Sequence, residues 1–109
     1  MAEIVWTEKA STHLQAIYKY IATDSPVYAA RFVKSLINAA NKLETMPFCG
    51  RIVPELDNQD LREVVFRNYR IVYSTSELPV LTILAVVHGA RDFTPTFSAE
   101  WDLTISVVK

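Results

Sequence analysis

The apolar residues of this chain change their spacing near residue 47, and this change limits the class of fold more than any other feature. Up to Leu43 the apolar residues recur at the spacing of an α-helix. Beyond Gly50 they form short runs that are typical of strands. The segment between the two patterns, Met46–Gly50, holds a proline and a glycine, which interrupt regular structure. The sequence therefore predicts a helical half followed by a sheet.

The first half is predicted to form a short strand over residues 2–6 and then two helices. Thr7 is placed to cap the first helix, which stops near Asp24, and Ser25 with Pro26 begins the second. Because few residues separate the helices, they form an antiparallel hairpin, and the second helix ends before Pro47. The apolar stripes are Ala10, Leu14, Ile17, Tyr18 and Ile21 in the first helix, and Ala29, Phe32, Val33, Leu36, Ala40 and Leu43 in the second.

The second half is predicted to form strands over residues 61–66, 69–74 and 80–87. A tight turn near Arg67 joins the first two, and Gly89 is expected to turn the chain with a positive φ after the third. The third strand is apolar on both faces, which indicates a central strand covered on one side by the helix hairpin. The predicted fold class is α+β, with an N-terminal strand and an antiparallel helix hairpin packed on a small, mostly antiparallel sheet.

Composition narrows the class of protein. The chain has 109 residues, which suits a single domain over residues 1–109. Its net charge of -1 excludes a strongly basic coat for nucleic acid. Neither a membrane-spanning run nor a signal peptide is recognised, so we expect a cytoplasmic protein with no membrane partner. The single cysteine, Cys49, is interpreted as a small apolar filler, and no metal or cofactor is implied.

Arginines mark the candidate functional region, because residues 51–91 contain arginines and no lysine. The strand ends are expected to bring together Arg62, Arg67, Arg70, Arg91, Tyr69, Tyr73 and His88. Such a cluster suits RNA cleavage by the 2′-hydroxyl, with Glu55 or His88 moving protons and Arg70 facing the charge on phosphorus. In the alternative, the arginines pair with acids such as Glu55, Asp60 and Glu63 while the tyrosines pack the core, and the parity of arginines and acids favours it.

The ordered set of motifs resembles the RelE/ParE superfamily of toxins from type II toxin–antitoxin systems. The resemblance covers residues 2–92 and leaves the tail, residues 93–109, outside. It rests on the opening strand Ile4–Thr7 with its following helix, Gly50-Arg51, Val53–Leu56, Leu61–Glu63, Tyr69–Tyr73 and Ile83–Asp92. It implies a helix hairpin on an antiparallel sheet.

The superfamily divides by target, and the resemblance implies two alternatives. RelE-like members resemble ribosome-dependent endonucleases of mRNA, and in that reading Arg70, Glu55 and His88 would be catalytic, supported by Arg62 and Tyr73. ParE-like and plasmid-stabilisation toxins instead inhibit DNA gyrase and lack nuclease residues. His88 lies one position away from where the nuclease pattern would place it. The last residues of the matched segment, from His88 to Arg91 and Asp92, are closer to the ParE pattern. We therefore favour a ParE-like toxin without catalytic residues.

Either reading implies a cognate antitoxin and a hetero-oligomer with it, and a third reading is a chain that only binds the antitoxin. The tail is expected to add a strand to the sheet or to order on the partner. Its aromatic residues Phe93, Phe97 and Trp101 are candidate docking points for the antitoxin.

Overall fold

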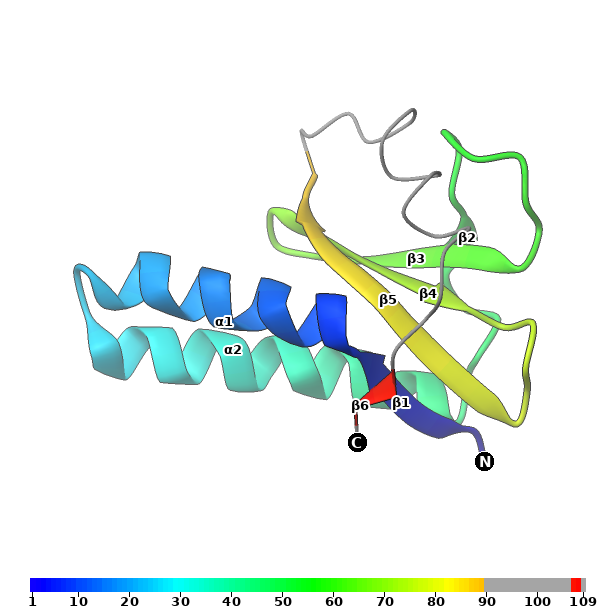
Figure 1. Ribbon diagram of the computed structural model, residues 1–109, viewed down its shortest axis with the longest axis horizontal. Helices are drawn as coiled ribbons and strands as arrows, with labels where there is room; N and C mark the ends of the chain where they lie inside the picture. The colour runs from blue at the N-terminus through cyan, green and yellow to red at the C-terminus, as the bar shows by residue number, and fades with distance from the viewer. Residues whose placement is uncertain (90–106, 109) are drawn as a thin grey trace.

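The computed structural model describes residues 1–89 and 107–108 (Figure 1). Strand β1 (Glu3–Thr7) leads into helices α1 (Glu8–Ala22) and α2 (Pro26–Asn41) and a 3-10 turn, η1 (Lys42–Glu44). The strands that follow are β2 (Arg51–Ile52), β3 (Leu61–Phe66), β4 (Tyr69–Ser74), β5 (Val80–His88) and β6 (Val107–Val108). In the described ranges, no helix is long and apolar enough to cross a membrane.

Side-chain caps begin both helices, as the sequence predicts. The Thr7 hydroxyl accepts a hydrogen bond from the Ala10 amide at 3.0 Å, and Ser25 caps α2 in the same way through the Tyr28 amide at 3.1 Å. Thr7 also donates to the carbonyl of Leu84 at 3.2 Å, which ties the start of α1 to β5. The second helix ends before Pro47, as predicted: α2 ends at Asn41 and its last turn tightens into η1.

The sheet confirms the predicted fold class. Its described strands lie in the order β2-β3-β4-β5-β1-β6, in which β1 runs parallel to β5 and every other neighbouring pair is antiparallel. β5 is central, and its residues 81–87 are all buried. The helix hairpin packs against one face of this sheet (Figure 1).

Two apolar clusters lie on the two faces of the sheet. On the helix face, Leu36 packs with Tyr73 and Ile83. On the opposite face, Val53 and Leu56 from the segment between β2 and β3 pack against Val72 of β4 and Ala85 of β5. The segment that joins β2 to β3 therefore covers the back of the sheet, and it carries Glu55 there.

Two expectations about single residues are wrong. Cys49 is exposed, because the inward contact of its segment is made by the backbone of Gly50, whose amide donates to the Tyr73 hydroxyl at 3.0 Å. Gly89 does not take a positive φ; among the described residues, Arg67 in the β3–β4 turn does so instead, with φ 55°. A two-residue turn between antiparallel strands needs such a backbone conformation, and here an arginine adopts it.

We expect Gly50→Ala to destabilise the fold by roughly 1–3 kcal/mol, because the new methyl group has no space. A Cβ at residue 50 would lie 2.5 Å from the carbonyl oxygen of Glu63 and 2.6 Å from the Tyr73 hydroxyl. Urea unfolding measures the effect. Gly89→Ala is the matched control, because its Cβ would lie 3.3 Å from the nearest atom, and we expect a loss below about 1 kcal/mol. Equal stability of the two variants would contradict the close approach at Gly50.

Candidate functional site

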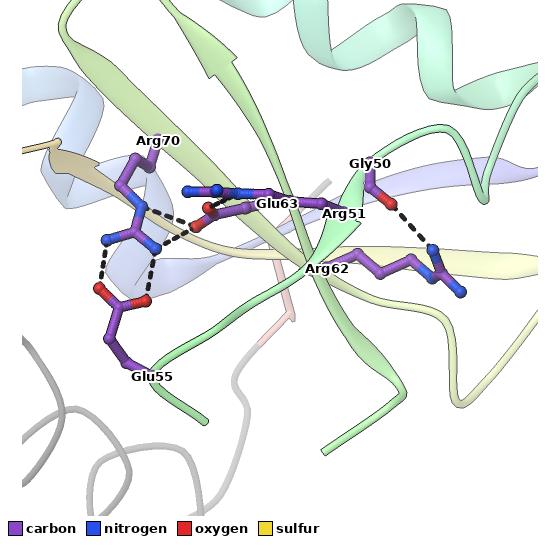
Figure 2. Close-up of polar contacts among 6 residues, drawn as sticks. All are labelled: Gly50, Arg51, Glu55, Arg62, Glu63 and Arg70. Atoms are coloured by element: carbon purple, nitrogen blue, oxygen red, sulfur yellow. Dashed lines mark hydrogen bonds and ion pairs between the residues drawn. The ribbon is translucent and has the colours of Figure 1, made fainter. Parts of the chain in front are cut away.

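Four charged side chains of alternating sign form a continuous network on the back of the sheet (Figure 2). Arg51 Nε donates to Glu63 Oε2 at 2.6 Å. Arg70 Nε donates to Glu63 Oε1 at 2.7 Å. The other end of the Arg70 guanidinium holds Glu55 with both of its terminal nitrogens, at 2.7 Å each. This is the bidentate geometry that an arginine adopts with a carboxylate or a phosphate.

Strand register explains why these residues meet. Arg51 of β2 pairs directly with Glu63 of β3. Glu63 is opposite Val72 and Val65 is opposite Arg70, so Glu63 and Arg70 are diagonal neighbours on one face. Glu55 comes from the segment that packs over this face through Val53 and Leu56, its buried neighbours.

Burial differs sharply along the network. The side chain of Glu63 is 0% exposed and that of Arg70 is 6% exposed, whereas Glu55 is 27% and Arg51 is 63% exposed. A carboxylate removed from water needs charged partners and hydrogen bonds, and Glu63 has two guanidinium groups. Hydrogen bonds from Arg70 lower the pKa of Glu55 despite partial desolvation, and those to Glu55 raise the pKa of Arg70.

A cleft of about 520 Å³ lies beside this network and is lined by four of the candidate residues, Glu55, Arg67, Arg70 and His88. Its lining residues are Arg51, Glu55, Val65, Arg67, Asn68, Arg70, His88 and Gly89. Glu55, Arg70 and His88 all border this cleft. Arg70 and its neighbour Val87 lie on the back of the sheet, whereas the ring of His88 contacts Tyr69, which packs on the helix side. Arg67 reaches the same cleft from the β3–β4 turn, and its guanidinium lies 5.7 Å from the centre of the Phe66 ring.

His88 ends β5 at the rim of the cleft, directly opposite Tyr69 of β4. The two rings meet edge to face with centroids 5.7 Å apart. Phe32 of α2 packs on the same tyrosine at 5.8 Å, so a row of rings connects the hairpin to His88. The His88 side chain is exposed, and packing against Tyr69 orients it without burying it.

Arg62 and Tyr73 do not line the cleft. They are paired across β3 and β4 and contact the segment that precedes β2. Arg62 Nη1 donates to the carbonyl of Gly50 at 2.8 Å, and the fully buried Tyr73 donates its hydroxyl to the carbonyl of Pro47 at 2.8 Å. Burial raises the pKa of Tyr73. In this structure the two residues hold the 47–50 segment in place.

The remaining expectations concern other parts of the chain. Arg91 and the predicted docking residues Phe93, Phe97 and Trp101 lie outside the described residues. Within the part that is described, no group of three or more His, Cys, Asp or Glu side chains is placed to hold a metal ion. Sequence reasoning did not place Arg51 at the cleft, because a two-residue strand has no periodicity to reveal it.

Comparison with known proteins identifies the family. The family model described as the ParE toxin of the parDE type II toxin–antitoxin system matches residues 4–93 of this chain. The chain belongs to this toxin family. The toxin is also 37% identical over 92 residues to Toxin RelE2 of Caulobacter vibrioides. The aligned residues make up 84% of this chain and 99% of that protein. Both matches lie within the RelE/ParE superfamily that the motifs indicate.

A solved structure shows the same fold. The toxin superposes on a chain of the chromosomal ParDE TA system from P. aeruginosa with a TM-score of 0.68. The match has 21% sequence identity and covers 81% of this chain and 96% of that one. It supports the architecture of the helix hairpin on the sheet.

We expect the two carboxylates of the network to differ in their contribution to stability. Glu63→Gln should cost about 3–5 kcal/mol, because it leaves two guanidinium groups around a buried neutral amide. Glu55→Gln should cost at most about 1 kcal/mol, because Glu55 is partly exposed and Arg70 keeps Glu63. Chemical denaturation of both variants measures the difference. A similar loss in the two variants would contradict the central role of Glu63.

The Glu55–Arg70 pair should also make stability depend on pH. The folded-state pKa of Glu55 lies below its ordinary value of 4.5, so the pair contributes fully above that pH and less as pH falls through the lowered folded pKa. The wild-type toxin should therefore lose its stability advantage over Glu55→Gln between pH 5 and the acid limit of folding. Urea unfolding of the two proteins across this range tests the prediction, and a gap that widens toward acid would disprove it.

Proposed function

We propose that the toxin is ParE-like: it binds DNA gyrase and inhibits it, and it has no catalytic residues of its own. The observation that carries this proposal is the state of Arg70. Its guanidinium already holds Glu55 in a bidentate pair and Glu63 through a further hydrogen bond. The cation that a nuclease would present to the reacting phosphate is engaged by the toxin's own carboxylates.

The proton chemistry supports the same proposal. Cleavage by the 2′-hydroxyl needs a base for that proton and an acid for the leaving oxygen, with pKa values near the working pH. The hydrogen bonds from Arg70 lower the pKa of Glu55, so it is ionised at neutral pH and is a weak base. Arg62 and Tyr73, which would assist a nuclease, bind the 47–50 segment instead.

One observation favours ribosome-dependent cleavage of mRNA as the second candidate function. Glu55, Arg70 and His88 line one cleft, together with the exposed Arg51 and Arg67. In this reading a substrate phosphate would take Arg70 from Glu55, and His88 would transfer protons. An inhibitor that works by binding has no chemical need for His88, and this difference separates the two functions.

As a member of a type II toxin–antitoxin system, the toxin has an antitoxin partner. We further propose that this partner forms a hetero-oligomer with the toxin and contacts the tail. Phe93, Phe97 and Trp101 stay the predicted docking residues, because large aromatic side chains anchor many protein interfaces.

Toxin freed of its antitoxin is expected to abolish DNA supercoiling by gyrase, and adding the antitoxin is expected to restore it. His88→Gln is expected to inhibit as well as the wild-type toxin, because it removes the ability to transfer protons and one ring contact with Tyr69 at an exposed position. The same two proteins are then compared for cleavage of mRNA on translating ribosomes.

Normal supercoiling with folded toxin, together with mRNA cleavage that falls about 10²–10⁴-fold in His88→Gln, would replace the proposal with the nuclease. Activity in neither assay, with tight antitoxin binding, would leave the reading in which the chain only binds its antitoxin. Circular dichroism of His88→Gln confirms that the variant is folded.

A further inference from the structure

The edge of β5 that faces β1 is covered by a strand over only part of its length. β1 pairs with residues 80–83 of β5, and the chain then enters α1 at Glu8. Beyond that point the backbone groups on this edge of β5 need other partners. Side chains at the start of the helix supply two of them. The Thr7 hydroxyl donates to the Leu84 carbonyl at 3.2 Å, and the Val86 amide donates to Nδ1 of His13 at 3.0 Å.

The Val86 amide lies where a missing acceptor would weaken the fold. Val86 is 3% exposed. Its amide points away from β4, because the strand register turns the amides of Val87 and Gly89 toward β4. A buried amide that loses its acceptor destabilises the folded state. His13 is half-buried on α1, and its ring nitrogen is the acceptor at this position.

Only one charge state of His13 can make this contact. A neutral imidazole has one nitrogen that accepts, whereas the protonated ring donates from both nitrogens and accepts from neither. Since Nδ1 is the acceptor here, the proton of the neutral ring lies on Nε2. Protonation would turn two donors, the amide and Nδ1, toward each other, so the hydrogen bond would break. An imidazole in a peptide takes up this proton at about pH 6.5.

Few groups that are charged or titrate near neutral pH stand on the described elements that pack against α1. β5 contributes only His88, and Val107–Val108 of β6 contributes none. Lys9 lies one helical turn before His13 on the same side of α1, so a charge on His13 would stand near another positive charge. The others are Glu3 of β1, Arg31 and Lys34 of α2, and Glu8 and Lys19 of α1. Cations outnumber carboxylates on these elements, which favours the neutral ring.

We propose that His13 is a pH-sensitive latch that joins the helix hairpin to the central strand β5. In the neutral ring Nδ1 accepts from Val86 and the latch is closed; as pH falls through the range in which imidazole is protonated, the latch opens. Folding uses the lone pair that a proton would take, so the unfolded chain binds the proton more readily and stability falls as pH falls. The latch goes beyond gyrase inhibition and does not depend on it, because it concerns the fold of the isolated toxin.

Urea unfolding of the full-length toxin between about pH 8 and about pH 5.5 tests the latch, in a range above the one in which carboxylates titrate. The unfolding equilibrium constant of the wild type is expected to rise on the order of tenfold toward the acid end. His13→Asn is expected to abolish this rise, because its side-chain oxygen can accept from the amide at the position of Nδ1 and does not titrate. His88→Gln is the matched control: the chain has 2 histidines, and removing the other one should leave the rise intact.

Amide hydrogen exchange locates the effect in the strand. The protection factor of Val86, which is corrected for the intrinsic pH dependence of exchange, is expected to fall toward acid by more than that of Val87, whose amide faces β4. A rise of the unfolding constant that is equal in the wild type and His13→Asn would overturn the proposal, as would no rise in the wild type. If His13→Asn does not fold, exchange in the wild type decides, with protonation of His13 followed by its NMR signals. Unchanged protection of Val86 while the His13 ring is protonated would then overturn the latch.

Discussion

The buried carboxylate of Glu63 is the interaction on which the back of the molecule depends. A charge with no exposed surface is stable in a protein only where partners surround it, and its partners come from two other strands. Arg51 brings in the short edge strand β2, and Arg70 brings in β4 and, through Glu55, the segment between β2 and β3. The partners of this one carboxylate thus link three parts of the chain to one another.

The two faces of the sheet are covered by different means. On one face the helix hairpin buries a continuous apolar cluster, and its aromatic members reach His88 through Tyr69. On the other face a segment without helices or strands supplies Val53 and Leu56, and ion pairs complete the cover. The cleft lies at the end of the sheet, beside the segment between β2 and β3. Several of its residues belong to strands that the two apolar clusters hold in place. A rigid base with charged residues at its rim suits a binding site.

Local signals in the sequence predicted most of the fold. Thr7 and Ser25 mark the helix starts because a hydroxyl at that position satisfies an amide, whatever the tertiary structure. Composition favours pairing of the arginines with acids such as Glu55, Asp60 and Glu63, but it does not assign an acid to each arginine. The geometry of the pairing between Arg70 and its two carboxylates, and the position of Arg70 beside His88, depend on the register of β3, β4 and β5. No local signal places Arg51 at the cleft or gives Arg67 its positive φ, since both depend on how β3 pairs with its neighbours.

The network also limits what the cleft of this toxin can do chemically. The cleft holds the residue types of a nuclease, but in this chain the decisive arginine binds two carboxylates of the same molecule. An arginine in that state stabilises the back of the sheet, whereas the same arginine facing a phosphate would stabilise a transition state. Of its two carboxylate partners, Glu55 is the partly exposed one, on a segment between strands, and such a segment can change without disturbing the core. The chemistry open to this cleft therefore depends less on which charged residues are present than on which of them bind each other.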